Sequence, residues 1–264
     1  MAGAKSLKPN ANRLMHINAL PGVRLAACLA VVATVACGSS DDAPRRTTPS
    51  AASRTSISHG PASGNEGGPR IVVLGDSLTA GLGLPIEDAY PAVLQRRLDG
   101  QRLKYHVINA GISGDTSAGG LARLDWALEG DVRILIVALG GNDALRGLPV
   151  SQLKDNLARI IQRAQARGVT VILAGMEAPP NWGDEYTKAF HDVYPALAAE
   201  YHLALVPFLL EGVAGIDRLN QRDGIHPTAE GDRMVADTVW EILEPVIAAA
   251  GDQPASRGKG TPGS

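Results

Sequence analysis

Arg70-Ile71-Val72-Val73-Leu74-Gly75-Asp76-Ser77-Leu78 joins an apolar, β-branched run to a short polar turn. A run of this kind is typical of a strand that is buried on both faces, as in a parallel sheet. Similar runs recur along the chain, and together they predict a parallel sheet. The predicted strands cover residues 70–74, 105–109, 134–139, 170–174 and 203–206.

Segments with helical spacing lie between these runs and after the last of them. Gly168 follows the third segment as a C-cap, and Thr228 begins the last segment as an N-cap. Alternating strands and helices predict an α/β fold: a three-layer α/β/α sandwich with a flavodoxin-like five-stranded parallel sheet in the order 2-1-3-4-5. The predicted helices cover residues 90–98, 120–128, 153–166, 185–200 and 228–249.

Four short blocks follow the carboxyl ends of predicted strands. In an open parallel sheet, this edge is where ligands bind. Strands two and three flank strand one in the expected order. Strand five lies three strand spacings from strand one, roughly 14 Å at about 4.8 Å each, and the connection after it is long enough to return to strand one. The sequence therefore predicts one site at this edge. The blocks are Gly75-Asp76-Ser77-Leu78, Gly114-Asp115-Thr116, Gly140-Gly141-Asn142-Asp143 and Asp223-Gly224-Ile225-His226-Pro227.

The residue types in these blocks match the needs of acyl transfer by a serine. Ser77 is the candidate nucleophile, His226 the base that takes its proton, and Asp223 the carboxylate that holds the base. The oxyanion hole is assigned to the backbone N–H groups of Ser77 and Gly114 and the amide of Asn142. The chain has no Gly-x-Ser-x-Gly, which argues against an α/β-hydrolase nucleophile elbow.

Two segments with apolar residues follow strand ends near the predicted site, at residues 145–150 and 176–182. They are candidates for a groove that binds an acyl group. They could equally be ordinary connections that close the core. The groove candidates are Leu145, Leu148, Pro149, Met176, Pro180 and Trp182.

The four blocks together resemble the SGNH, or GDSL, hydrolase family. The resemblance rests on Ser77, Gly114, Asn142 and His226 with Asp223, and it extends to residues 109–116, 119–124 and 140–147, which look like the thioesterase I, lysophospholipase and arylesterase branch. It implies a serine esterase that hydrolyses carboxylic esters and thioesters, including aryl esters, acyl thioesters and lysophospholipids, through an acyl-enzyme on Ser77. It also implies that no metal or other cofactor takes part.

Two other functions compete with this interpretation. A carbohydrate acetylesterase acting on cell-wall or extracellular glycans would use the same site, and a tethered acyl- or lipid-binding protein would use the fold without turnover. Nucleic-acid binding is disfavoured because 25 Lys and Arg residues against 27 Asp and Glu residues give a net charge of −2 with no basic stripe. We expect a monomer that acts on a small-molecule ester or thioester.

The two ends of the chain differ in composition from the predicted hydrolase domain, residues 70–250. An apolar run from Leu25 to Ala36 follows several basic residues and predicts a signal peptide over residues 1–37. Thr34-Val35-Ala36-Cys37 resembles the bacterial lipobox, which implies lipidation of Cys37 and a membrane contact through a lipid anchor. Ordinary cleavage after Ala36 is the alternative. The chain is thus expected to be an exported bacterial protein, either a cell-envelope lipoprotein or a periplasmic or secreted protein.

Residues 38–69 and 251–264 are poor in large apolar residues and rich in Ser, Thr, Pro and Gly. Such segments cannot bury enough surface to offset the entropy lost on ordering. They are predicted to be a disordered tether and a disordered tail.

Overall fold

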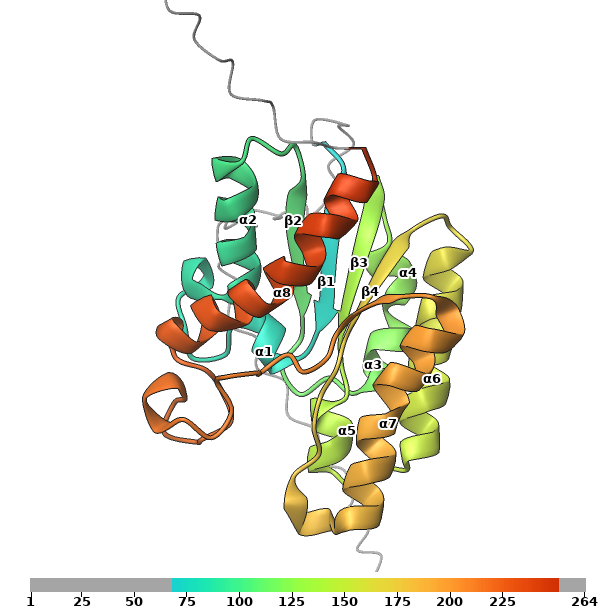
Figure 1. Cartoon of the computed structure of the whole chain (residues 1–264), viewed down its shortest axis with the longest axis vertical. Coiled ribbons are helices and arrows are strands. Elements are labelled where there is room, and N and C mark those ends of the chain that lie inside the picture. The colour runs from blue at the N-terminus through green and yellow to red at the C-terminus, as the bar shows by residue number, and fades with distance from the viewer. Residues whose placement is uncertain (1–67, 252–264) are drawn as a thin grey trace, which may run out of the picture. The chain divides into compact units, whose positions relative to one another are not determined.

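The computed structural model describes residues 68–251 (Figure 1). The predicted signal peptide, Cys37, the predicted tether up to residue 67 and the predicted tail from residue 252 lie outside the described residues.

A five-stranded parallel sheet in the order β2-β1-β3-β4-β5 forms the centre of the described domain. The predicted fold class and strand order are therefore confirmed. The strands are β1 (Arg70–Gly75), β2 (His106–Gly111), β3 (Val132–Ala138), β4 (Thr170–Ala174) and β5 (Ala204–Val206).

Helices connect the strands, and short 3-10 turns, labelled η, interrupt three of the connections. The α-helices are α1 (Ser77–Ala80), α2 (Tyr90–Gly100), α3 (Ser117–Ala122), α4 (Leu124–Ala127), α5 (Gly141–Leu145), α6 (Val150–Gln165), α7 (Asp184–Tyr201) and α8 (Ala229–Ala249). The 3-10 turns are η1 (Ile86–Asp88), η2 (Pro180–Trp182) and η3 (Asp217–Leu219).

The helices form two layers, one on each face of the sheet (Figure 1). Helices α2 and α8 pack against each other, while α6 contacts α3 and α7 in the other layer. Strands β1 and β3 are almost wholly buried between the layers. This burial explains their continuous apolar sequence.

Strand β2 differs from the other long strands because it lies at an edge of the sheet. His106 and Ile108 are exposed, whereas Val107 and Asn109 are half-buried. A hollow lined by Ile108, Ala110 and Trp126 lies beside this strand, so the apolar run seen in the sequence is not a fully buried strand here.

The predicted helix over residues 120–128 is wrong as a single element, because the chain breaks between α3 and α4 at Arg123. The Arg123 guanidinium donates to an Asp115 carboxylate oxygen at 2.6 Å and to the Gly75 carbonyl at 2.9 Å. These contacts tie the break to the end of β1, beside the predicted site.

Helix α8 starts as predicted, since the Thr228 hydroxyl accepts a hydrogen bond from the Gly231 N–H. Asp232 in the same turn has a further role: its carboxylate accepts from the Tyr90 N–H at 3.0 Å, at the start of α2. One buried carboxylate thus joins the first turns of two helices that are far apart in the sequence.

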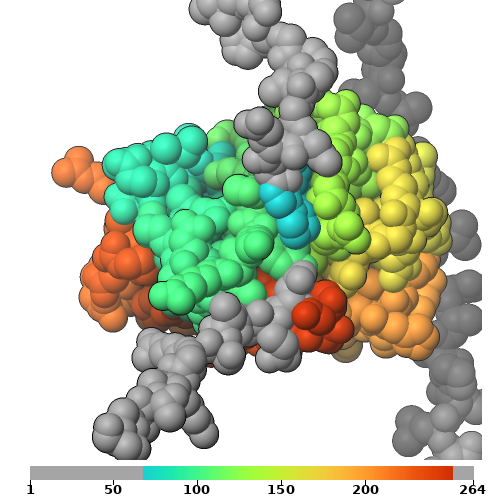
Figure 2. Space-filling view, turned by 90° about the horizontal axis from the view of Figure 1, so that it is seen from above, coloured from blue at the N-terminus to red at the C-terminus, as the bar shows by residue number. Residues whose placement is uncertain are grey.

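The two edges of the sheet differ in what they carry. By edge we mean here the side of the sheet where the parallel strands begin or the side where they end. β1 begins and α8 ends at the first of these edges, which Figure 2 shows from above. The opposite edge, where the strands end, carries all four sequence blocks, and we call it the catalytic edge.

Candidate active site

Ser77 is the first residue of α1 and directly follows the end of β1. Asp76 caps this helix, because its Oδ1 accepts from the Leu78 N–H at 3.0 Å. Gly75 is required by packing, since a Cβ there would lie 1.9 Å from the Thr79 Oγ1 atom. The sharp turn places the Ser77 side chain at the catalytic edge.

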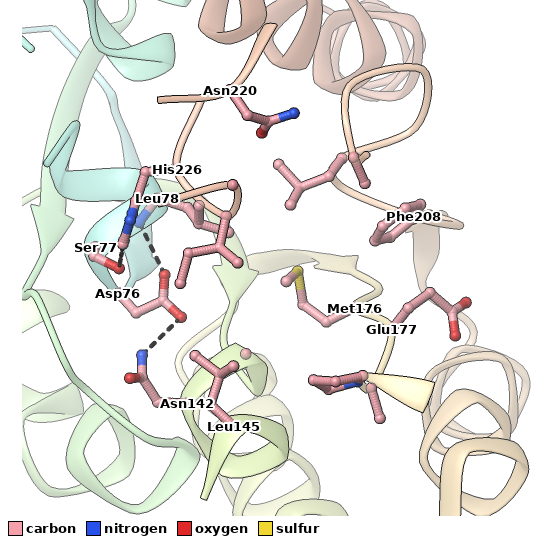
Figure 3. A pocket seen from close by; sticks show the side chains of 17 residues that line it. Asp76, Ser77, Leu78, Asn142, Leu145, Met176, Glu177, Phe208, Asn220 and His226 are labelled. Atoms are coloured by element: carbon pink, nitrogen blue, oxygen red, sulfur yellow. Dashed lines mark hydrogen bonds between the residues drawn. The ribbon is translucent and has the colours of Figure 1, made fainter. Parts of the chain in front are cut away.

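His226 and Asp223 form the other half of the site, in the connection that leads into α8. The His226 Nε2 atom lies 2.9 Å from the Ser77 Oγ atom (Figure 3). Its Nδ1 atom lies 2.8 Å from the Asp223 Oδ2 atom. A serine, an imidazole and a carboxylate are thus linked in one hydrogen-bonded chain. This is the arrangement that activates a serine hydroxyl.

The Asp223 carboxylate is held by its own loop. Its Oδ1 atom accepts from the Ile225 and His226 N–H groups, each at 3.1 Å. The hydrogen bond from the Ile225 N–H, together with those from His226, lowers the pKa of Asp223 to about 2. The carboxylate therefore stays ionised over the pH range in which most enzymes work, and it can stabilise an imidazolium at His226.

Asn142 lies in the first turn of α5, directly beyond the end of β3. Its Nδ2 atom lies 3.2 Å from the Asp76 Oδ2 atom (Figure 3). Gly140 before it has φ of +122°, and a Cβ there would meet the Tyr194 hydroxyl at 2.1 Å. Only glycine fits this approach, which brings the amide next to the serine turn.

Gly114 follows β2, the neighbour of β1 on the other side. Gly75 at the end of β1 pairs with Gly111 of β2 and with Ala138 of β3. The segments that carry Gly114 and Asn142 therefore flank the serine turn. The Arg146 guanidinium joins these two segments by donating to the Gly114 carbonyl at 2.7 Å.

A buried carboxylate fixes the segment that carries Asn142. Asp143 accepts from the Ser117 N–H at 2.8 Å and from the Ser117 hydroxyl at 2.6 Å. Asn156 of α6 in turn donates to the Ser117 Oγ atom at 3.0 Å. This buried network ties α5 to α3 and α6, so the Asn142 backbone has little freedom.

Asp76 is an ionisable group in an apolar setting. Burial raises its pKa to about 6, against the opposing effect of the hydrogen bonds from Leu78 and Asn142. When ionised, this carboxylate can only accept hydrogen bonds, so it selects the NH₂ side of the Asn142 amide. The second N–H of that amide is left for another acceptor.

An apolar pocket of about 280 Å³ opens beside Ser77 and His226 (Figure 3). Two of the predicted groove residues, Leu145 and Met176, line it. Glu177, Ala178 and Pro179 of the predicted groove segment and Ile225 of the fourth block also line it. The remaining wall comes from a stretch after β5 in which the sequence analysis found no site residue: Phe208, Leu210, Ala214 and Asn220.

The other four residues predicted for the groove do not line this pocket. Leu148 and Trp182 are engaged by helix α7 instead. The Tyr186 hydroxyl donates to the Leu148 carbonyl at 2.9 Å, and the Trp182 ring lies 6.0 Å from the Tyr186 ring. Pro149 precedes α6, and Pro180 begins η2.

Asp76 and the run Phe208-Leu209-Leu210 are the main residues that the sequence analysis missed. The apolar run directly after a predicted strand is a signal that could have indicated a pocket wall at the catalytic edge. Asp76 stands before the candidate nucleophile, but its contact with Asn142 joins residues 66 positions apart. No local pattern indicates such a contact.

Within residues 68–251, no group of three or more His, Cys, Asp or Glu side chains is placed to hold a metal ion. The described helices also include none that is long and apolar enough to cross a membrane.

Residues 73–234 match the model of the GDSL-like lipase/acylhydrolase family. The chain belongs to this family and is an ester-hydrolysing enzyme, as the sequence resemblance predicted. Among curated relatives, esterase TesA of Pseudomonas aeruginosa is 47% identical over 178 residues, which cover 67% of this chain and 89% of the relative. The thioesterase 1/protease 1/lysophospholipase L1 of Escherichia coli is 39% identical over 178 residues, covering 67% and 84%.

A solved crystal structure of TesA is 47% identical, with a TM-score of 0.65, and the match covers 67% of this chain and 99% of that chain. A chain with little besides this domain therefore folds and crystallises. The described residues 68–251 all belong to one compact unit, and we take residues 60–264, which contain them, as the protein for experiments.

Asp76→Asn is expected to lower kcat by about 10- to 100-fold while KM changes by less than about twofold, since the loss of one charged hydrogen bond costs about 1.5–3 kcal/mol. Asparagine can both donate and accept, so it no longer selects the orientation of the Asn142 amide. Steady-state kinetics on a soluble ester test this. A fall in kcat/KM that comes only from KM would contradict a positioning role for Asp76.

The same substitution should raise stability at neutral pH. The raised pKa of Asp76 means that its contribution to stability is complete below about pH 4 and is lost as the pH rises through about 6. Asp76→Asn should therefore have a higher Tm than the parent, and its gain in unfolding free energy should grow between about pH 4 and 7, up to about 3 kcal/mol. Asp232→Asn is a matched control, because burial also raises the pKa of Asp232, to about 7. It should show the gain in Tm without the loss in kcat.

Proposed function

We propose that the protein is a serine esterase that hydrolyses carboxylic esters and thioesters through an acyl-enzyme on Ser77. The observation that carries the proposal is the hydrogen-bonded chain from the Ser77 hydroxyl through His226 to Asp223, with contacts of 2.9 and 2.8 Å. This chain opens onto an apolar pocket at the catalytic edge.

In the first half of the reaction, the His226 Nε2 atom takes the proton of Ser77 as the Oγ atom attacks the substrate carbonyl carbon. The imidazolium then gives this proton to the leaving oxygen or sulfur. In the second half, His226 takes a proton from water as the water oxygen attacks the acyl carbon, and the imidazolium then returns this proton to the Ser77 Oγ atom as the C–Oγ bond breaks and the acid leaves. Asp223 remains ionised throughout and stabilises the imidazolium in each half.

The tetrahedral intermediates carry a negative oxygen that needs donors. The Asn142 amide and the backbone N–H groups of Ser77 and Gly114 are the donors in this proposal. The position of Asn142 beside the serine turn, and of Gly114 on the neighbouring segment, supports the assignment.

The size and lining of the pocket favour one acyl or aryl group. Its volume of about 280 Å³ is near the lower end of the range for small-molecule sites, about 300–1,000 Å³. The lining is mainly aliphatic, which suits a hydrocarbon chain. Single-chain substrates such as acyl thioesters and lysophospholipids, or aryl esters, are therefore the proposed class.

A series of p-nitrophenyl esters from acetyl to palmitoyl, together with an acyl thioester of matched chain length, tests this substrate class. Because the pocket wall is apolar, kcat/KM should rise from acetyl toward medium chains, by up to about threefold to fourfold per buried CH₂ at about 0.8 kcal/mol each. The thioester should also be hydrolysed. A sharp optimum at acetyl without thioester activity would instead favour a carbohydrate acetylesterase.

We also propose that the chain is exported and that Cys37 is lipidated, which would hold the domain at a membrane of the cell envelope. The support is the sequence alone: an apolar run from Leu25 to Ala36 followed by Cys37, all outside the described residues. Labelling of the protein with a fatty acid in a bacterial host tests this. Labelling that persists in Cys37→Ser would contradict it.

A further inference from the structure

Seven of the nine exposed large apolar side chains of the described domain lie at the catalytic edge, and the other two are Ile108 of β2 and Trp126 of α4. Single exposed apolar residues are normal on any protein surface, but a cluster of them marks an interaction site. Every connection that follows a strand at this edge contributes at least one, and we call this set the apolar rim. It consists of Leu82 and Ile86 after β1, Ile112 after β2, Leu145 after β3, Trp182 after β4, and Ile216 and Ile225 after β5.

The opposite edge of the sheet shows no such set. No large apolar residue is exposed in the segments directly before β2, β3, β4 and β5, residues 101–105, 128–131, 166–169 and 202–203, although exposed Trp126 of α4 stands close before the second of them. Exposed residues there are mostly charged, and they include Arg102, Lys104, Glu129, Asp131 and Arg167. The contrast between the two edges argues against a chance scatter of apolar residues.

Contacts between the connections place rim residues around the pocket. Leu145 and Ile225 both line it. The Gln221 side chain donates to the Leu82 carbonyl at 2.7 Å, which holds the first connection against the last. The Ile112 N–H donates to the Gly75 carbonyl at 3.1 Å, next to the serine turn. Leu145 and Ile225 are therefore exposed apolar side chains of the pocket itself, and Leu82 and Ile112 lie on neighbouring connections.

The charges of the same connections indicate what kind of surface the rim fits. Acidic side chains outnumber basic ones there, so an anionic surface gains no electrostatic attraction. The acidic residues are Glu87, Asp88, Glu177, Glu211, Asp217 and Asp223, against Arg146, Arg218 and Arg222, and the pair Asp115 and Arg123 cancels.

We infer that the apolar rim docks the catalytic edge onto the surface of a zwitterionic phospholipid aggregate. Docking places the pocket mouth at the interface, where a single-chain amphiphile can pass into the pocket without its hydrocarbon chain crossing water. This inference deepens the proposed function and rests on it for the identity of the substrate, but not for the docking itself.

An N-terminal anchor would be compatible with this orientation. The described chain begins at the edge opposite to the rim (Figure 2). Thirty residues, 38–67, separate Cys37 from the described domain. A chain of this length spans up to about 100 Å when fully extended, at about 3.3 Å per residue. This reach allows the catalytic edge to face the membrane.

The test measures co-sedimentation of residues 60–264 with vesicles of palmitoyl-oleoyl-phosphatidylcholine. All proteins carry Ser77→Ala, so hydrolysis plays no part and the result does not depend on the proposed function. The Ile86→Glu/Ile216→Glu variant replaces two rim residues that do not line the pocket. The Trp126→Glu/Ile108→Glu variant is the matched control, because both residues are exposed by 37% or more but lie away from the rim.

We expect the parent to bind, the rim variant to partition onto vesicles at least about tenfold less, and the control to stay within about twofold of the parent. Adding an anionic lipid should not strengthen binding. An equal loss in the control, no binding by the parent, or binding that requires anionic lipid would overturn the inference. So would a dimer of residues 60–264 that the rim variant dissociates, since the rim would then join two copies of the chain.

With Ser77 intact, the rim variant should hydrolyse soluble p-nitrophenyl butyrate like the parent. Its hydrolysis of a monoacyl phospholipid carried in the same vesicles should fall by about tenfold, in step with binding. Vesicle binding without hydrolysis of any ester by the Ser77 protein would support docking while refuting the proposed function.

Discussion

Ser77→Ala is expected to lower kcat by about 10⁴–10⁶, and His226→Ala should do nearly the same. The hydroxyl at residue 77 is the attacking group, and without the imidazole 2.9 Å away nothing takes its proton. The Ser77→Ala/His226→Ala double variant should be little worse than either single variant, because the two residues act as one unit. Purified proteins assayed on a soluble aryl ester give the three rates.

His106→Ala is the control for these variants, since His106 is an exposed residue on the edge strand β2, and its activity should match that of the parent. Losses that add in the double variant would mean that Ser77 and His226 act independently. That result would contradict the hydrogen-bonded chain as the catalytic unit.

Asn142→Ala is expected to lower kcat by about 10²–10³, with little change in substrate affinity. The amide is assigned to the oxyanion, which exists in the tetrahedral intermediates and not in the bound substrate, so its loss should appear in the chemical step. Asn142→Asp keeps the shape but removes the donor, and at neutral pH it adds a negative charge beside Asp76. It should therefore be at least as harmful as Asn142→Ala. A change in KM alone would assign Asn142 to substrate binding.

The convergence of the site residues could be predicted because it depends on few rules. Parallel strands place their carboxyl ends at one edge, and the strand order puts the segments of Gly114 and Asn142 on either side of Ser77. His226 and Asp223 are three residues apart, so one turn brings them together. Sequence patterns capture these relations because they are local or follow from the topology.

Other features depend on contacts between distant residues, and the sequence pattern misses them. The helical spacing of residues 120–128 is real, yet Arg123 leaves the helix to bind the Gly75 carbonyl. Asp232 looks like an ordinary first-turn residue of α8, but it caps α2 by accepting from Tyr90. Trp182 follows a strand end as a groove residue would, and it lies against Tyr186 instead. In each case a residue that is distant in the sequence determines which contact the side chain makes.

Asp76 shows the same limit at the centre of the site. Its sequence position suggests no more than a helix cap, and that role is present. Its second oxygen contacts Asn142, and burial raises its pKa to about 6. Both facts follow from the packing of β1 against β3, which brings the two blocks together.

The most direct test is covalent labelling of residues 60–264 by a p-nitrophenyl alkylphosphonate, followed by mass spectrometry of the peptides. Attack by an activated hydroxyl on phosphorus releases p-nitrophenol and leaves one phosphonyl group on the protein. We expect stoichiometric labelling on the peptide that contains Ser77, no labelling of Ser77→Ala, and much slower labelling of His226→Ala. An unlabelled Ser77 in a folded protein, or a label on another residue, would contradict the assignment of Ser77 as the nucleophile and would favour the acyl-binding alternative.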